Sequence, residues 1–170
     1  MVLIYLSPVP WHSFAQRPHK FVEWLHNKMG CDVLWLEPYP TRLPNWSDIK
    51  SRGSRAVAQT QDTPNCNWLT VVQPSALPIE PLWGIRYIND VMWRQVLSQT
   101  CITAANQEVM LVVGKPSRLA IKLLSFFKDA ISVYDAMDDF PAFYRGLSKL
   151  SMKNEQAKVV SQVSYILASS

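Results

Sequence analysis

Short apolar runs recur along the chain and predict β-strands. The first of them, "VLIYL" at residues 2–6, is apolar at every position, as expected of a strand that is buried on both faces of a sheet. The runs lie at residues 2–6, 32–38, 67–74, 108–114, 130–136 and 163–169. The pattern therefore predicts about six strands.

Between these runs, apolar residues recur at the spacing of one helix face. The predicted helices lie at residues 17–30, 85–105, 117–129 and 143–162. In the first helix, Pro18 suits the first turn and Gly30 suits the C-terminal cap. In the second helix, Ile88, Met92 and Val96 are expected on the side that faces the core.

The alternation of strands and helices predicts an α/β fold, a Rossmann-like doubly wound parallel sheet in a three-layer αβα arrangement. In such sheets, ligands bind beyond the carboxyl ends of the strands. The segments expected at that edge are residues 7–16, 37–42, 73–84, 114–118 and 135–140. None of them carries the glycine-rich fingerprint of a dinucleotide site or of a P-loop.

Composition places the chain among globular proteins of ordinary size. It has 170 residues, 48% of them hydrophobic and 18% charged, which suits a single domain with a full core. The net charge of +4 and the pI of 9.0 are mildly basic. This excess is compatible with phosphate-bearing substrates or an anionic membrane surface, and alone it gives no reason to expect nucleic acid.

Features of the chain predict a cytoplasmic location. Pro8 and Pro10 interrupt the first apolar run, and no basic residue precedes it, so it is expected to be a strand and not a signal peptide. No apolar run approaches the length of a membrane span. Cys31, Cys66 and Cys101 lie far apart and predict no disulfide framework.

The histidines do not predict a metal site. His12, His19 and His26 follow one another at intervals of seven residues. Seven residues of helix rise about 10.5 Å, which is too far for the ligands of one ion. We therefore expect no metal among these side chains.

The stretch "VYDAMDDF" places Asp135, Asp138 and Asp139 at the end of an apolar strand. Clustered carboxylates suit Mg²⁺. Alternatively, Asp138 or Asp139 caps the helix that follows. A third interpretation is a carboxylate, partly desolvated by neighbouring aromatic rings, that accepts a proton from an attacking hydroxyl or holds a sugar. The residues alone leave these alternatives open.

Three segments resemble parts of a known enzyme family. They are "IYLSPVPWHSFAQRPHKFVEWLHNKMGCDVLWLEPYPTRLP", "VYDAMDDFPAFYRG" and "VSYILASS". In this order they are similar to the N-terminal, acceptor-side domain of bacterial GT-B-type glycosyltransferases of exopolysaccharide and cell-surface glycan synthesis. The resemblance spans essentially the whole chain. One departure is "PVPWHS", which stands where many relatives have a Gly-Gly turn.

The resemblance implies a sugar transfer from a nucleotide-sugar donor to an acceptor hydroxyl, in a cleft between two domains. Residues 1–170 would form the first domain, and the donor-binding domain would follow them. Asp138 is then the expected base, with Asp135 and Asp139 as neighbours that orient or tune it. The side chains expected to bind substrate are Trp11, His12, Gln16, Arg17, Lys115 and Arg118. The donor is a substrate, and no cofactor or metal is expected.

A membrane surface is a further expected partner. Residues 39–60 and 75–87 combine aromatic and basic side chains, which together hold peripheral proteins on anionic bilayers. The resemblance points the same way, because related enzymes act on lipid-linked or glycan acceptors at the inner face of the plasma membrane. The alternative to an enzyme is a non-catalytic, flavodoxin-like binding or interaction module, in which the acids are helix caps.

Overall fold

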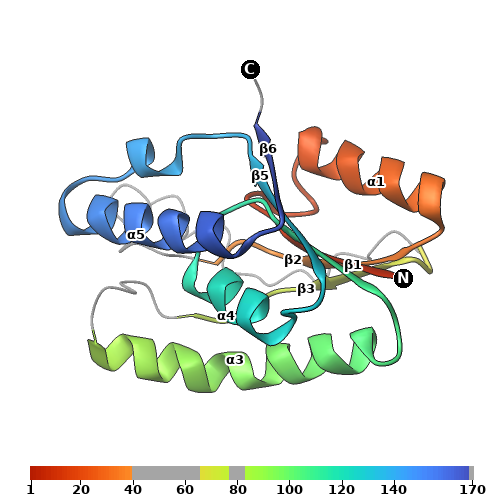
Figure 1. Cartoon of the computed structure of the whole chain (residues 1–170), viewed down its shortest axis with the longest axis horizontal. Coiled ribbons are helices and arrows are strands. Elements are labelled where there is room, and N and C mark those ends of the chain that lie inside the picture. Colours follow the sequence, from red (N-terminus) through yellow and green to blue (C-terminus); the bar gives the residue numbers. More distant parts are fainter. Residues whose placement is uncertain (40–65, 77–82, 169–170) are drawn as a thin grey trace, which may run out of the picture.

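The computed structural model of the protein describes residues 1–39, 66–76 and 83–168. In this part of the chain, parallel strands form one sheet in the order β3-β2-β1-β4-β5-β6 (Figure 1). The strands are β1 (Val2–Leu6), β2 (Asp32–Leu36), β3 (Leu69–Val72), β4 (Val109–Val113), β5 (Ile131–Ala136) and β6 (Tyr165–Ala168). The predicted doubly wound α/β fold with a Rossmann-like sheet is confirmed.

Helices cover both faces of the sheet and complete the three layers. They are α1 (Arg17–Met29), α3 (Trp83–Ala104), α4 (Arg118–Phe126) and α5 (Gly146–Gln162), with the short 3-10 helix η1 (Phe140–Phe143) before α5. Helix α1 lies on one face, and α3, α4 and α5 lie on the other (Figure 1). No helix in the described ranges is long and apolar enough to cross a membrane.

The core is divided by the sheet into two apolar clusters. Every residue of β1 is buried, because helices pack on both of its faces. On the α1 side, Tyr5 stacks on Trp35 with ring centroids 5.2 Å apart, and Val22 and Leu25 of α1 pack against them. On the other side, Trp93 of α3 is completely buried among residues of α4 and the sheet.

The orientation of α3 differs from the prediction. Ile88 and Met92 were expected to face the core together with Val96, but only Val96 is buried, while Ile88 and Met92 are exposed. The core side of α3 instead carries Trp93 and the polar residue Asn89. Trp93 is the largest side chain on the helix face that includes Val96. Burying it gives more free energy than burying the smaller side chains of Ile88 and Met92.

The helix predicted at residues 143–162 begins at Gly146, three residues later than expected, and a separate 3-10 helix precedes it. The 3-10 helix η1 ends at Phe143, and α5 begins at Gly146. Gly146 has a φ of 56°, in the left-handed region that glycine adopts without steric cost. The chain therefore turns between Phe143 and Gly146, and the helix does not run through.

From β1 the chain adds β2 and then β3 on one side, and it next crosses back to add β4, β5 and β6 on the other side of β1. The direction of winding therefore changes between β1 and β4. This switch point is the usual ligand site of open α/β sheets. Gly114, directly after β4, donates its backbone N–H to the carbonyl of Leu6 at 2.9 Å. A Cβ atom on Gly114 would lie 2.8 Å from Cδ of Pro8 and 3.1 Å from the hydroxyl of Tyr5. Only glycine allows the two strand ends to approach this closely.

Gly114→Ala is expected to destabilise the protein by about 1–3 kcal/mol, because the added methyl group forces the ends of β1 and β4 apart. Gly84→Ala is the matched control, because a Cβ at Gly84 meets no atom within 4 Å. Helix propensity should make that change neutral or slightly stabilising. Urea unfolding of both variants measures the difference in stability. Equal unfolding midpoints would show that the close approach of β1 and β4 does not contribute to stability.

Candidate functional site

A buried ion pair joins two segments that are far apart in the sequence. Arg17, the first residue of α1, places Nη2 at 2.7 Å from Oδ1 of Asp135 in β5. The hydroxyl of Tyr5 in β1 donates a hydrogen bond of 3.1 Å to Oδ2 of the same carboxylate. Three elements therefore meet at Asp135. The ion pair connects the segment "AQRPH" with the segment "YDAMDDF", at the carboxyl ends of the strands.

The two charges of this pair differ in exposure. The side chain of Asp135 is 1% exposed, whereas that of Arg17 is 43% exposed. Among the described residues, Oδ1 of Asp135 receives no directed hydrogen bond, so its short contact with Arg17 is a contact between charges. Arg17 thus balances a buried negative charge while much of its own side chain remains in contact with solvent.

Tyr5 is the third member of this cluster. Burial of the side chain, and next the charge of Asp135, raise the pKa of the Tyr5 hydroxyl far above its ordinary value. The hydroxyl therefore keeps its proton and donates a hydrogen bond to Asp135. Tyr5 and Arg17 together fix the carboxylate, which cannot itself reach a ligand at the surface.

The loop after β1 is held by internal contacts. The backbone N–H of Trp11 donates to Oε1 of Glu37 at 3.0 Å, and the Trp11 ring packs edge-on against Trp35 with centroids 5.0 Å apart. His19 is buried, and its Nδ1 accepts the backbone N–H of Gln16 at 3.1 Å. The proton of the ring is therefore on Nε2, which donates to the carbonyl of Trp11 at 3.0 Å. These contacts fix the backbone that leads into α1.

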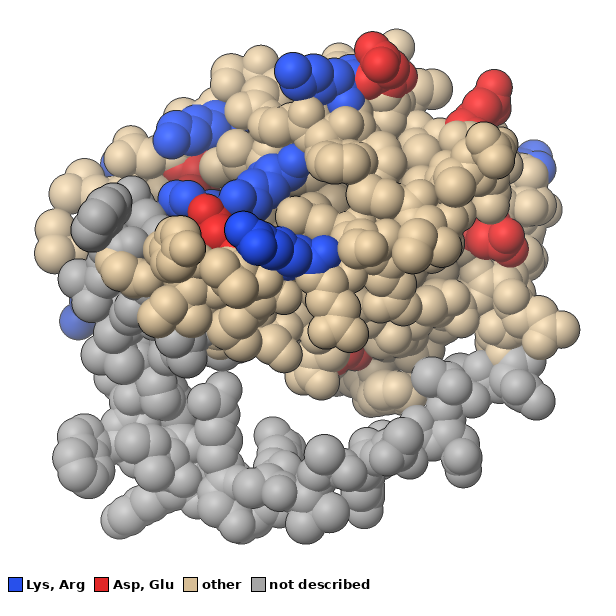
Figure 2. Space-filling view, turned by 90° about the horizontal axis from the view of Figure 1, so that it is seen from below, with Lys and Arg blue, Asp and Glu red and all other residues tan. Residues whose placement is uncertain are grey.

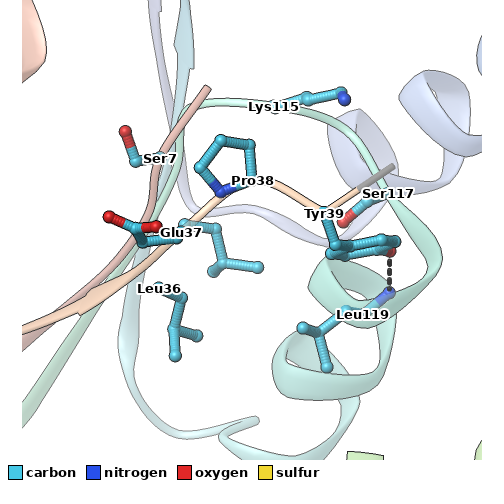
Figure 3. Close-up of a pocket in the computed structure, with 9 residues that line it drawn as sticks. Ser7, Leu36, Glu37, Pro38, Tyr39, Lys115, Ser117 and Leu119 are labelled. Carbon is cyan, nitrogen blue, oxygen red and sulfur yellow. Dashed lines mark hydrogen bonds between the residues drawn. The ribbon is translucent and has the colours of Figure 1, made fainter. Parts of the chain in front are cut away.

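A small, shallow hollow, open to solvent, lies beyond the carboxyl ends of β1 and β2 (Figure 3). Its polar lining comes from Ser7, Glu37, Lys115 and Ser117. Ser117 is the N-cap of α4, and its hydroxyl accepts the backbone N–H of Ala120 at 3.2 Å. Of the residues predicted to bind substrate, Lys115 lines this hollow. The hollow is next to the switch point of the sheet.

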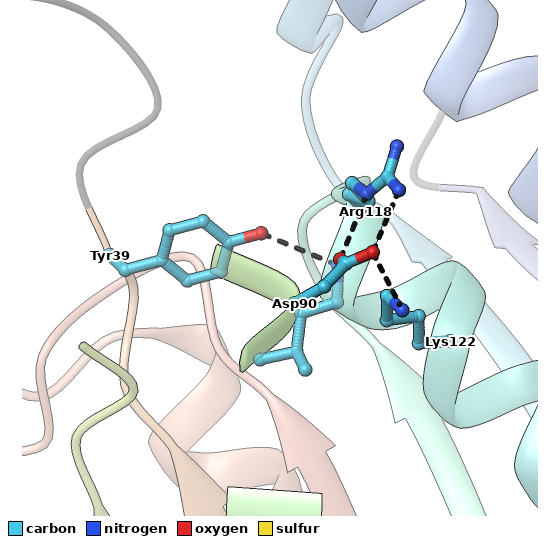
Figure 4. A network of polar contacts seen from close by, with 5 residues as sticks. Tyr39, Asp90, Arg118 and Lys122 are labelled. Atoms are coloured by element: carbon cyan, nitrogen blue, oxygen red, sulfur yellow. Dashed lines mark hydrogen bonds and ion pairs between the residues drawn. The ribbon is translucent and has the colours of Figure 1, made fainter. Parts of the chain in front are cut away.

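Arg118 has a defined partner on α3. Its Nε and Nη2 atoms donate to the two carboxylate oxygens of Asp90 at 3.3 and 3.1 Å, and Lys122 approaches the same carboxylate at 3.2 Å (Figure 4). Partial burial favours protonation of Asp90, but the hydrogen bonds and charges of Arg118 and Lys122 outweigh it and lower the pKa of this carboxyl. Arg118 therefore faces α3, on the opposite side of the sheet from Arg17.

Asp138 and Asp139 are exposed in the connection between β5 and η1. Asp139 directly precedes η1, but its carboxylate accepts no hydrogen bond from the helix, so the capping alternative is not seen at this residue. The backbone carbonyls take this role instead, since those of Asp138 and Asp139 accept the N–H groups of Phe140 and Ala142 at 3.0 and 2.9 Å. Both carboxylates are left open to solvent at the ligand edge.

The structure brings some predicted site residues together and separates others. Arg17 and Asp135 are in contact, Trp11 and Gln16 build the adjacent loop, and His12 is exposed in that loop. Tyr5 was missed at the sequence level. The sequence did contain an indication of its role. Tyr5 is a tyrosine within a strand expected to be fully buried, and a buried hydroxyl needs a hydrogen-bond partner.

Among the described residues, no group of three or more histidine, cysteine or acidic side chains is arranged so that it could hold a metal ion. No protein-family model matches the chain, and no curated protein matches it either. The fold class is that of Rossmann-like α/β proteins, and the site is a charged cluster at the carboxyl edge of the sheet.

Proposed function

We propose that the chain is the acceptor-side domain of a glycosyltransferase of the GT-B type, which transfers a sugar from a nucleotide-sugar donor to an acceptor hydroxyl. The observation that supports this most is the ion pair between Arg17 and Asp135. It unites two of the segments that resemble such enzymes, and it does so at the edge where open parallel sheets bind ligands. The product would be a cell-surface polysaccharide or glycolipid.

The reaction assigns different tasks to the charged residues. The acceptor hydroxyl loses its proton as its oxygen attacks the anomeric carbon, and an exposed carboxylate at the edge suits this task. Asp138 is the proposed base, with Asp139 as its neighbour. The bond to the nucleotide diphosphate breaks, and the departing diphosphate carries the electron pair. Arg17 has the charge and the planar donors to stabilise it.

Asp135 holds Arg17 in place and does not touch substrate in this scheme. Its burial and its contacts with Arg17 and Tyr5 support that role. Trp11, His12, Gln16 and Lys115 are proposed to bind the acceptor or the sugar. Arg118, tied to Asp90, would contribute only if that pair opens.

We further propose a cytoplasmic location, peripheral at the inner face of the plasma membrane. The net charge of +4 supports attraction to anionic lipids. Of the loops that the sequence suggested for this contact, residues 40–60 and 77–82 lie outside the described residues.

Transfer assays with the product of the whole gene test the proposal. That protein is expected to transfer a sugar from a nucleotide sugar to a lipid-linked or glycan acceptor. The isolated chain of 170 residues should show no transfer and weak nucleotide affinity by calorimetry, because the proposed donor domain is not part of it. Tight binding of a nucleotide sugar to the 170-residue chain would contradict the division into two domains.

The runner-up is a free-standing binding or interaction module with a flavodoxin-like sheet. The carboxyl-edge hollow is compatible with a binding module. The strand order 3-2-1-4-5-6 is that of Rossmann-like sheets, whereas flavodoxin-like sheets have the order 2-1-3-4-5, so the flavodoxin-like part of this alternative does not fit. A gene product without transfer activity on any nucleotide sugar would favour this module over the enzyme.

A further inference from the structure

One side of α3 carries apolar side chains that no other element covers in the described part of the chain. Tyr87 is 72% exposed, and Ile88, Val91 and Met92 are exposed between 37% and 45%. Tyr87 and Val91 are four residues apart, as are Ile88 and Met92, so the two pairs form adjacent stripes on the helix. Together they make a contiguous apolar patch in the first half of α3.

Cations border this patch. Arg94 is exposed, and it lies three residues after Val91 and seven after Tyr87, on the same side of the helix. Arg118 and Lys122 of α4 are about one third exposed and share the single carboxylate of Asp90. Figure 2, which views the molecule from the side of α3, shows a group of Lys and Arg side chains with acidic atoms among them, beside a broad uncharged area. Three cations against one acid leave an excess of positive charge here.

We propose that this surface, formed by Tyr87, Ile88, Val91, Met92, Arg94, Arg118 and Lys122 and here named the α3 surface, docks on an anionic lipid bilayer. Apolar and aromatic side chains flanked by cations are the combination that holds a helix in the interfacial plane of a membrane. The occupant is identified by charge, because anionic headgroups complement the excess of cations. This docking surface would explain how the protein is held at the membrane. It rests on the proposed peripheral location and does not depend on sugar transfer.

A second copy of the chain fits this surface less well. In a symmetric dimer the same patch would face itself, and the cations of both copies would meet. Like charges brought together in this way oppose association. A bilayer places negative charge opposite every cation at once.

Co-sedimentation of the 170-residue chain with vesicles tests the proposal. Vesicles of phosphatidylcholine mixed with phosphatidylglycerol should bind the protein at low salt and release it at high salt. Arg118→Gln combined with Lys122→Gln should lower the partition coefficient about thirtyfold at low salt, at about 1 kcal/mol for each cation. Tyr87→Ser combined with Val91→Ser should weaken binding at both salt concentrations, because its contribution is apolar.

The matched controls lie on α1, on the opposite face of the sheet. Lys20→Gln with Lys28→Gln removes two cations, one of which is paired with Glu23, and Trp24→Ser with Met29→Ser removes two exposed apolar side chains. Both controls should bind as the unaltered chain does, and circular dichroism verifies that each variant is folded. Arg94→Gln gives a second charge variant, because Arg94 forms no ion pair among the described residues.

Three results would overturn the proposal: no binding to anionic vesicles, equal binding to phosphatidylcholine alone, or equal losses in the α1 and α3 variants. No sugar transfer enters the measurement. Vesicle binding can therefore fail while transfer is found, and transfer can fail while the vesicles bind.

Discussion

Arg17→Met is expected to lower the free energy of unfolding by about 2–3 kcal/mol. Removing one partner of a buried ion pair costs about 3–5 kcal/mol, because the other charge is left uncompensated. The value here is placed below that range, since Arg17 is 43% exposed and water can approach the vacated position. Chemical denaturation followed by circular dichroism measures the change.

Two further variants show whether the loss comes from the charge of Asp135. Lys20→Met removes the cation of an exposed pair with Glu23 on the same helix and should cost at most about 1 kcal/mol. Arg17→Met combined with Asp135→Asn removes both charges and leaves an oxygen that can accept the hydrogen bond of Tyr5. This double variant should recover part of the stability. A loss in Arg17→Met no larger than in Lys20→Met would mean that the ion pair is not a structural element.

Under the proposed function, Asp138→Asn should reduce the turnover of the whole gene product by about 10²–10⁴, the usual contribution of a general base, with little change in donor binding. Asparagine keeps the size of the side chain but cannot accept a proton from the acceptor hydroxyl. Initial rates of transfer and calorimetric titration with the donor separate the two effects.

Asp32→Asn is the control for this experiment. Asp32 is also exposed, but it begins β2 and therefore lies at the amino edge of the sheet, away from the site. Its replacement should leave turnover unchanged. If Asp138→Asn retained full turnover, the base would have to be another group, and Asp139 would be the next residue to replace.

The strands were the part of the fold that sequence patterns predicted well. Runs such as "VLIYL" and "VMLVV" are apolar at every position, because α1 covers one face of the sheet and α3, α4 and α5 cover the other. The rotation of α3 was predicted wrongly. Ile88, Met92 and Val96 have helical spacing, but the adjacent face contains Trp93, which buries more apolar area. Helical spacing alone does not show which of two overlapping apolar faces of a helix is the one that packs against the core.

The site was predictable only in part. Their position at the carboxyl ends of strands directed attention to the segments around Arg17 and Asp135, and the structure brings these two residues into contact. The contact between Tyr5 and Asp135 spans 130 residues and follows from strand order, which a single sequence does not reveal. The pairing of Arg118 with Asp90 is similar, since it depends on how α3 and α4 lie against each other. The Asp138 and Asp139 predictions remain untested.

The two buried tryptophans give the protein built-in optical reporters. Trp35 lies in the cluster on the α1 side and Trp93 in the cluster on the α3 side, and neither indole N–H has a hydrogen-bond partner among the described residues. Each ring is therefore in an apolar surrounding whose loss changes its emission. The chain has seven tryptophans, so the reporter is a difference: the emission of the unaltered chain minus that of Trp35→Phe or of Trp93→Phe isolates the signal of the replaced ring. Because the sheet separates the two rings, each difference reports on one layer of the molecule.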